Sequence, residues 1–193
     1  MKRITVFCGS SMGGKEIFKN KAIALGKALV QRKIDLVYGG AKVGIMGVIA
    51  DAVLQEGGKV IGVLPRFLQA KELGHEGLTE LILVNSMHER KTKMNELCDG
   101  ALALPGGFGT LEELFEMLTW GQLGLHKKPV AILNIAGFYD SLDLLTQTMV
   151  NNGFLKASNR EMLLIDANID TILDKMENYK APEVLKWLAP KTL

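Results

Sequence analysis

Residues 105–113 combine a cluster of glycines with acidic side chains. They read Pro-Gly-Gly-Phe-Gly-Thr-Leu-Glu-Glu, follow a short apolar run at residues 101–104 and lead into an amphipathic segment. This order predicts a strand, a glycine turn and the start of a helix. Because glycine lacks a Cβ atom, the backbone can approach a ligand closely, and amides at a helix N-terminus attract anions. The pattern indicates a phosphate site formed by residues 107–110, with a carboxylate beside it.

Glu113 has two roles that are compatible with this pattern. Thr110 and Glu113 have the spacing of a capping box, in which the glutamate accepts a hydrogen bond from the threonine amide. Such a cap contributes about 1 kcal/mol and needs no preceding glycines. A structural cap and a catalytic carboxylate therefore both stay open for Glu113. Glu112 would point about 100° away on the helix, toward solvent or an interface.

A second helix start carries two positive charges. Ser86 and Glu89 form a capping box, which predicts that a helix begins there. Arg90 and Lys91 follow just past its first turn. Cations near the positive end of a helix are unfavourable for the helix alone, and a bound anion or a nearby carboxylate would relieve this. Solvated charges on a helix face are the alternative.

Short apolar runs alternate with longer helical segments along the whole chain, which predicts an α/β fold with a parallel sheet and helices on both faces. No linker, low-complexity tract or repeat divides it, so we expect a single domain over residues 1–193. Residues 65–79 form a long irregular connection, either a functional loop or a surface loop with a short helix. The expected strands are 4–8, 34–38, 60–64, 81–84, 101–104, 130–133 and 163–165, and the expected helices are 15–31, 45–56, 87–98, 110–125, 140–151 and 169–179.

Two further glycine turns fall at the carboxyl ends of expected strands, where ligands bind in such sheets. Residues 9–16 fit most of a nucleoside-triphosphate loop, but Glu16 occupies the place of the magnesium-binding Ser or Thr. Gly39 and Gly40 stand where a dinucleotide-binding protein has its ribose carboxylate. A nucleoside-triphosphate loop and a dinucleotide-binding site are therefore both disfavoured. Turns that bind no ligand are the alternative for these glycines.

Composition excludes several other classes of protein. The net charge of +2 gives no argument for nucleic acid or an anionic membrane as a partner, and no apolar run approaches a membrane span. Cys8 and Cys98 are far apart in apolar surroundings, which indicates buried thiols in a reducing cytoplasm. The three histidines are scattered, so we expect no metal site. The helix at residues 111–125 is apolar on several sides, which favours a homodimer interface over a thick monomer core.

At these residues the sequence resembles the Lonely Guy family of cytokinin riboside 5'-monophosphate phosphoribohydrolases, which are often misnamed lysine decarboxylases. The signature Pro-Gly-Gly-x-Gly-Thr-x-x-Glu is met by residues 105–113, and Met-His-x-Arg-Lys by residues 87–91. Further similarity covers nearly the whole chain, including residues 8–10, 38–40, 44–47 and 119–129. One departure is Ala41, where the family commonly has a glycine or serine.

The resemblance implies a Rossmann-like fold, generally in a homodimer with sites near the interface. It implies hydrolysis of the N-glycosidic bond of a cytokinin riboside 5'-monophosphate, with AMP as a further substrate, to free base and ribose 5-phosphate. No cofactor is needed. The implied catalytic pair is Arg90 and Glu113. The implied substrate contacts are Glu72, Arg90, Lys91, Gly107, Phe108, Gly109, Thr110, Leu111, Glu112, Glu113 and Thr119. A non-catalytic nucleotide or molybdenum-cofactor carrier on the same fold is the alternative.

Overall fold

Seven parallel strands form one sheet in the part of the chain that the structure describes. This computed structural model describes residues 1–72 and 74–182, except for the side chains of residues 70–72. The strand order is β4-β3-β2-β1-β5-β6-β7. The five inner strands are almost entirely buried, as expected for a sheet covered on both faces, whereas the edge strands β4 and β7 are mostly half-buried. The strands are β1 (Arg3–Phe7), β2 (Asp35–Tyr38), β3 (Val60–Pro65), β4 (Glu80–Val84), β5 (Gly100–Ala103), β6 (Val130–Leu133) and β7 (Leu163–Asp166).

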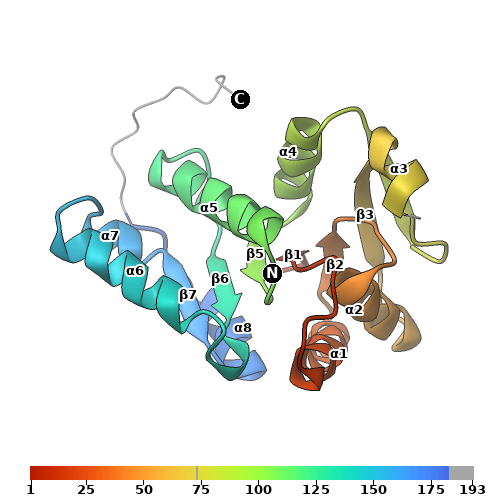
Figure 1. Ribbon diagram of the computed structural model, residues 1–193, viewed down its shortest axis with the longest axis horizontal. Coiled ribbons are helices and arrows are strands. Elements are labelled where there is room, and N and C mark those ends of the chain that lie inside the picture. Colours follow the sequence, from red (N-terminus) through yellow and green to blue (C-terminus); the bar gives the residue numbers. More distant parts are fainter. Residues whose placement is uncertain (73, 183–193) are drawn as a thin grey trace.

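The helices cover the two faces of the sheet (Figure 1). On one face, α1 (Glu16–Gln31), α2 (Gly44–Gln55) and α8 (Ile169–Glu177) pack over a core that includes Leu25 and Ile49. On the other, α4 (Met87–Leu97), α5 (Phe108–Gln122) and α6 (Asp140–Asn151) pack over a second core that includes Leu114 and Trp120. The predicted α/β fold, with helices on both faces of a parallel sheet, is confirmed.

Three short helical segments complete the described elements. The connection after β3 contains α3 (Arg66–Glu72), so the short helix expected in one of the two alternatives for residues 65–79 is present, and a functional role of this stretch stays a prediction. The short 3-10 helix η1 (Ile135–Gly137) and α7 (Ala157–Arg160) were not predicted, because segments of three or four residues carry no helical periodicity.

The strand order reverses between β1 and β5. β1 pairs with β2 on one side and with β5 on the other, so the connections leaving β1 and β5 turn to opposite sides of the sheet. Such a switch point leaves a crevice at the carboxyl ends of the strands. The two connections also touch each other, since the amide of Gly9 donates to the carbonyl of Pro105 at 3.3 Å. The crevice therefore lies beside the glycine cluster.

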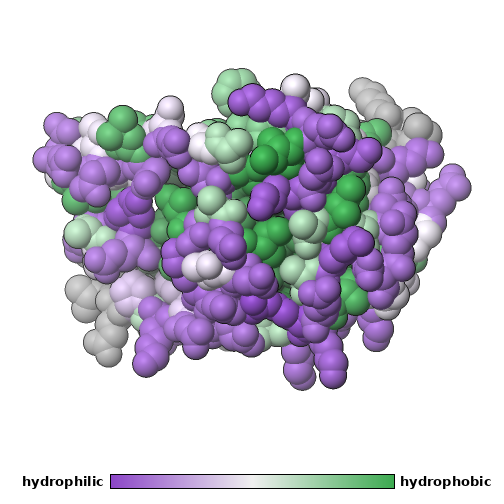
Figure 2. All heavy atoms as spheres, turned by 90° about the horizontal axis from the view of Figure 1, so that it is seen from below, coloured by the Kyte–Doolittle hydropathy of each residue, from purple (hydrophilic) through white to green (hydrophobic). Residues whose placement is uncertain are grey.

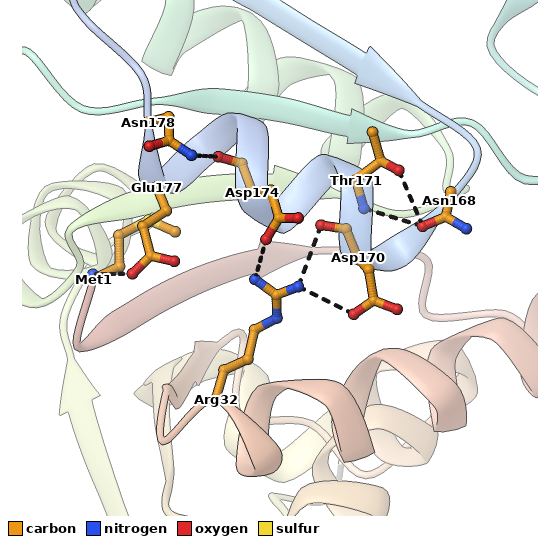
Figure 3. A network of polar contacts seen from close by, with 8 residues as sticks. All are labelled: Met1, Arg32, Asn168, Asp170, Thr171, Asp174, Glu177 and Asn178. Carbon is orange, nitrogen blue, oxygen red and sulfur yellow. Dashed lines mark hydrogen bonds and ion pairs between the residues drawn. The ribbon is translucent and has the colours of Figure 1, made fainter.

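The face that carries α1 and α8 is mainly polar. Figure 2, seen from below, shows that hydrophilic side chains cover most of this side of the molecule. Arg32, at the end of α1, binds α8 through Asp174 at 2.5 Å and Asp170 at 3.1 Å (Figure 3). The amino group of Met1 pairs with Glu177 at 3.7 Å. These contacts connect α8 to the end of α1 and the N-terminus to α8.

No helix among the described residues is both long and apolar enough to span a bilayer.

Candidate active site

A cavity of about 290 Å³ opens at the switch point. Its walls come from the ends of β1 and β5 and from the first turns of α2, α4 and α5. It thus brings together the glycine turns after β1 and β5 and the starts of α2, α4 and α5, whereas Gly39 and Gly40 do not line it. The lining residues are Cys8, Gly9, Ser10, Met46, Met87, Arg90, Gly107, Phe108, Gly109, Thr110, Glu112 and Glu113.

The N-terminus of α5 forms the anion cradle. The helix begins at Phe108 with Gly107 as its N-cap, and no side chain caps it. The first amides of a helix have no acceptor within it, so those of residues 107–110 are the donors that face the cavity. The predicted helix start after the glycine turn thus lies at the cavity, and its binding of a phosphate stays a prediction.

The predicted cap at Thr110 is wrong. Thr110 lies inside the first turn of α5, is only 3% exposed and does not precede the helix. A Cβ atom on Gly106 would lie 2.1 Å from the Thr110 hydroxyl oxygen. The absence of that atom allows the hydroxyl to pack against the turn, and the helix to begin before Thr110. Glu113 consequently has no capping role to fill.

Glu113 is a half-buried carboxylate on the cavity wall. Among the described residues it has no hydrogen bond and no ion pair within 4.0 Å. Burial raises the pKa of Glu113 to about 7, because the charged form loses hydration. The charge of Arg90 opposes this shift, whereas Glu112 and Glu116 add to it. An acidic group that titrates near neutral pH in a cavity is typical of a catalytic site.

Arg90 is held rigidly opposite the cradle. It is 7% exposed, its Nε atom donates to the carbonyl of Val63 at 3.1 Å, and its Nη2 atom donates to that of Gly39 at 3.1 Å. Two backbone acceptors satisfy only part of the five donors of a guanidinium. A third, weak contact runs from its Nη1 atom to the sulfur of Met87 at 3.8 Å, so N–H donors remain for the cavity that Arg90 lines.

The glycine after β2 allows this position of Arg90. A Cβ atom on Gly39 would lie 2.0 Å from Nη2 of Arg90. The Gly39–Gly40 turn thus contributes to the site because Gly39 leaves space for the guanidinium and its carbonyl oxygen accepts a hydrogen bond from it. Ala41, the departure from the family pattern, fits without difficulty: it is buried and forms an isolated bridge with Gly74.

Lys91 lies outside the cavity. Its Nζ atom donates to Glu116 at 3.0 Å and also contacts Glu112. The α4 helix begins as predicted, because the Ser86 hydroxyl accepts the amide of Glu89 at 3.0 Å. The charge of Lys91 near this helix start is thus balanced by carboxylates of α5.

Four other candidate residues lie away from the cavity, at its edge or outside the described side chains. Thr119 lies three turns along α5, donates to the carbonyl of Phe115 and lines a separate cavity of about 170 Å³. Leu111 packs on the core, and Phe108 is 94% exposed at the edge of the site. Glu72 is the last residue of α3, and its side chain is outside the described residues.

Sequence reasoning missed four lining side chains: Cys8, Ser10, Met46 and Met87. All four belong to segments that resemble the family, and Ser10 follows a glycine at the predicted ligand edge, so the signal was present. Burial, and then the charge of Glu113, raise the pKa of the Cys8 thiol well above its ordinary range. Cys8 is therefore a poor nucleophile at neutral pH.

A second, apolar cavity of about 250 Å³ adjoins the first and shares Gly9, Ser10 and Gly107 with it. Its walls include Phe18 and Phe138, whose rings meet edge to face at 5.8 Å. Within the described residues, no group of three His, Cys, Asp or Glu side chains is arranged to hold a metal ion.

The fold and the site together define a Rossmann-like α/β protein with an anion cradle, an arginine and a neutral-range carboxyl group around one crevice. The family model described as possible lysine decarboxylase matches residues 46–176. An Arabidopsis thaliana cytokinin riboside 5'-monophosphate phosphoribohydrolase is 46% identical over 92% of this chain and 84% of its own length. A probable one from Oryza sativa is 44% identical over 96% of this chain and 78% of its own.

The chain therefore belongs to the Lonely Guy family, the family of these relatives, and the resemblance found in the sequence is confirmed. Solved structures agree on the fold. A molybdenum cofactor binding protein from Rippkaea orientalis has a TM-score of 0.68 at 21% identity, covering 92% of this chain and 96% of its own. The molybdenum cofactor carrier protein of Chlamydomonas reinhardtii has a TM-score of 0.67 at 19% identity, and the match covers 91% of this chain and 96% of that protein.

Proposed function

We propose that this protein hydrolyses the N-glycosidic bond of cytokinin riboside 5'-monophosphates, and of AMP as a further substrate, to free base and ribose 5-phosphate. The observation that carries the proposal is the position of Glu113, a half-buried carboxyl group without a partner among the described residues, one turn beyond the amides of a helix N-terminus. The cytokinin riboside 5'-monophosphate phosphoribohydrolase activity for which relatives at 46% identity are named supports it.

The geometry suits a 5'-nucleotide. The amides of residues 107–110 bind the phosphate as an anion at the positive end of α5. One helical turn is about 5.4 Å, which is the length that a ribose bridges between its 5'-phosphate and C1'. A phosphate in the cradle thus brings the bond to be broken near Glu113.

Glu113 acts as a carboxylate in this reaction. Cleavage of the bond between C1' and the base builds positive charge on the sugar, as in glycoside hydrolysis. A carboxylate stabilises that charge and orients the attacking water. Because it accepts no hydrogen bond from the described residues, its oxygen atoms are available for both tasks.

Arg90 supports the departing group and the phosphate by its charge. A guanidinium remains protonated in proteins, so Arg90 does not act as a general acid. Its fixed position, with two donors on the carbonyls of Val63 and Gly39, makes it a preorganised positive charge. Charges held in place before reaction stabilise a transition state without reorganisation.

The rate of base release is expected to rise with pH through about 7. The pKa of Glu113 is raised to about 7, and the reaction needs its ionised form, so activity falls as pH drops below this value. The second pKa of the substrate phosphate, about 6, lies lower. We would measure kcat/KM for AMP between pH 5 and 9, since this quantity reports the free enzyme. If kcat/KM stays constant down to pH 5 and falls only below it, the proposal that Glu113 must ionise near pH 7 is contradicted.

Base release tests the function directly. The protein is incubated with AMP and with isopentenyladenosine monophosphate, and free base is separated by chromatography. We expect free base from the cytokinin nucleotide, with adenosine and isopentenyladenosine as unphosphorylated controls that react far more slowly. Protein that binds nucleotide but releases no base from either monophosphate would instead support the carrier alternative.

We further propose a homodimer. Large apolar side chains are exposed on α5, on α6 and after α6, including Phe108 at 94%, Phe154 at 88% and Leu144 at 69%. A second copy that covers this surface would remove them from water. Light scattering at micromolar concentration should give twice the mass of the chain. The Phe154→Asp variant should give the mass of a single chain. A wild-type monomer would refute the proposal.

We also propose that the protein works in the cytoplasm without a cofactor. Its two cysteines, Cys8 and Cys98, are free and buried, which suits a reducing compartment. Cell fractionation would check the location. Full activity of protein treated with a chelator and extensively dialysed would check the absence of a cofactor.

A further inference from the structure

The apolar cavity of about 250 Å³ has no part in the proposed reaction. Its large side chains are those of Met12, Phe18, Ile45 and Phe138, and none of its lining residues carries a charge. Of the residues that the family resemblance implies as substrate contacts, only Gly107 lines it. We refer to it as the apolar cavity and to its neighbour, which holds the proposed catalytic pair, as the catalytic cavity.

The two cavities meet at the start of α5. Gly107, the N-cap of this helix, lines both of them, as do Gly9 and Ser10 in the turn after β1. A Cβ atom on Gly107 would meet nothing within 4 Å, so the space beside its backbone is open. An anion at the amides of residues 107–110 would therefore border on both cavities. A group attached to that anion can extend into either one.

The cavities offer different chemistry to such a group. The catalytic cavity presents Arg90 and Glu113, whereas the polar side chains that line the apolar cavity are Ser10 and Ser11. The hydroxyl of Ser11 already accepts the amide of Gly13 at 3.3 Å. A charged group would find no partner among these lining residues, and burying a charge without a partner is costly. An uncharged apolar group therefore fits this cavity best.

The size of the apolar cavity sets the size of that group. A dry apolar cavity of about 150 Å³ binds benzene, so about 250 Å³ is sufficient for one aromatic ring or a short branched chain. Met12 is 39% exposed and Phe138 is 46% exposed. A ligand that covers these two side chains removes their apolar surface from water, which favours binding.

The aromatic wall of the apolar cavity is held in place by its neighbours. The ring of Phe138 meets that of Phe18 edge to face at 5.8 Å and that of Tyr139 at 4.9 Å. The Tyr139 hydroxyl donates to the carbonyl of Leu104 at 2.7 Å. The turn before Phe138 contains Ala136 at a φ of 52°, a left-handed conformation that is unfavourable for a residue with a Cβ atom. Such a conformation persists where the surrounding structure imposes it, so this wall is formed before any ligand binds.

We propose that the apolar cavity is a subsite for an uncharged apolar group carried by a phosphate monoester, whose phosphate occupies the amides at the start of α5. The ligands are thus the phosphates of short aryl or branched alkyl alcohols. Such a ligand competes with a nucleoside monophosphate, because both use the same amides, and it offers Glu113 no glycosidic bond to cleave. The inference rests on the phosphate cradle of the proposed function.

Calorimetric titration with two phosphate monoesters tests the subsite. Phenyl phosphate carries an aromatic ring, and methyl phosphate is the matched ligand with the same ionisable group and almost no apolar surface. Burial of the ring should make phenyl phosphate bind at least about tenfold more tightly than methyl phosphate. Affinities within about threefold of each other would overturn the inference, and so would the absence of binding by both ligands.

Phe138→Ser removes the aromatic wall of the subsite. The affinity ratio of the two ligands should then fall below about threefold, while methyl phosphate binds as it does to the wild type. Phe67 on α3 provides the matched control, because it is exposed to a similar extent, 54%, and lines neither cavity. Phe67→Ser should keep the wild-type ratio. A wild-type ratio in Phe138→Ser would contradict the inference.

Methionine methyl NMR locates the ring in the unaltered protein, so the test does not depend on the folding of a variant. Met12 lines only the apolar cavity, and Met46 and Met87 line only the catalytic cavity. Because an aromatic ring shifts the signals of neighbouring nuclei, phenyl phosphate should shift the Met12 methyl signal more than that of Met87. A shift of Met87 with none at Met12 would place the ring in the catalytic cavity, and the inference would be wrong.

Competition separates this inference from the proposed function. Phenyl phosphate should raise the apparent KM for AMP in base release without a change in kcat, because the two ligands share the amides of α5. Tight binding beside Met12 in a protein that releases no base would refute the hydrolase and support the subsite. Base release by a protein that does not prefer phenyl phosphate would do the reverse. Tight binding beside Met12 without competition would indicate a separate phosphate site and also contradict the inference.

Discussion

Glu113→Gln is expected to reduce base release by about 10²- to 10⁴-fold while the protein remains folded. The amide cannot carry the negative charge that stabilises the sugar cation, although it fills the same space. Because Glu113 has no capping role in α5, the loss should appear in kcat, and binding of the nucleotide should be largely retained. Single-turnover kinetics and nucleotide titration measure the two quantities separately.

The same substitution is expected to stabilise the protein above pH 7. The pKa of Glu113 is raised from 4.5 to about 7 on folding, so the folded state binds more protons than the unfolded state between these values, and stability falls as pH rises through this window. Glutamine does not titrate. Its gain in the free energy of unfolding should be absent below about pH 4.5 and reach at most about 3 kcal/mol at pH 8.

Urea unfolding at pH 4 and pH 8 would measure this gain. Glu96→Gln on α4, an exposed carboxylate, provides a control that should change neither activity nor the pH dependence of stability. A Glu113→Gln protein that is less stable than the wild type at both pH values would show that the carboxylate has a structural partner. Retained turnover would remove Glu113 from the mechanism.

Gly39→Ala is the second substitution for which a large effect is expected. Its Cβ atom would lie 2.0 Å from Nη2 of Arg90 and 3.1 Å from the sulfur of Met46. The guanidinium must then move and lose its bond to the Gly39 carbonyl. Overpacking of this kind costs about 1–3 kcal/mol, and displacement of Arg90 should reduce kcat/KM at least about tenfold.

Gly14→Ala is the matched control, because a Cβ atom at Gly14 meets nothing within 4 Å. Urea unfolding and kcat/KM should be close to wild type in this variant. In an Arg90→Met background, the stability cost of Gly39→Ala should largely disappear, since the clashing atom is gone; a double-mutant cycle measures this coupling. An equal cost in both backgrounds would assign the effect to the backbone of the turn.

Local sequence patterns were sufficient to predict most of the strands and helices and the sheet edge at which the site lies. Apolar runs such as residues 130–133 and the periodic segment at residues 140–151 were predicted with the bounds that the structure has. Alternation of such segments leads to a parallel sheet, and glycine turns after strands locate a ligand edge. These features depend on neighbours in the chain, which the sequence displays directly.

Tertiary structure alone decided what the individual side chains do there. Thr110 has the spacing of a cap, yet it packs against Gly106 inside the helix. Arg90 and Lys91 are adjacent in sequence, but one contacts β3 and the turn after β2 while the other contacts α5. The neutral-range pKa of Glu113 arises from burial among residues distant along the chain. Local spacing limits where a group can lie, whereas its partners and its hydration depend on which segments the fold brings beside it.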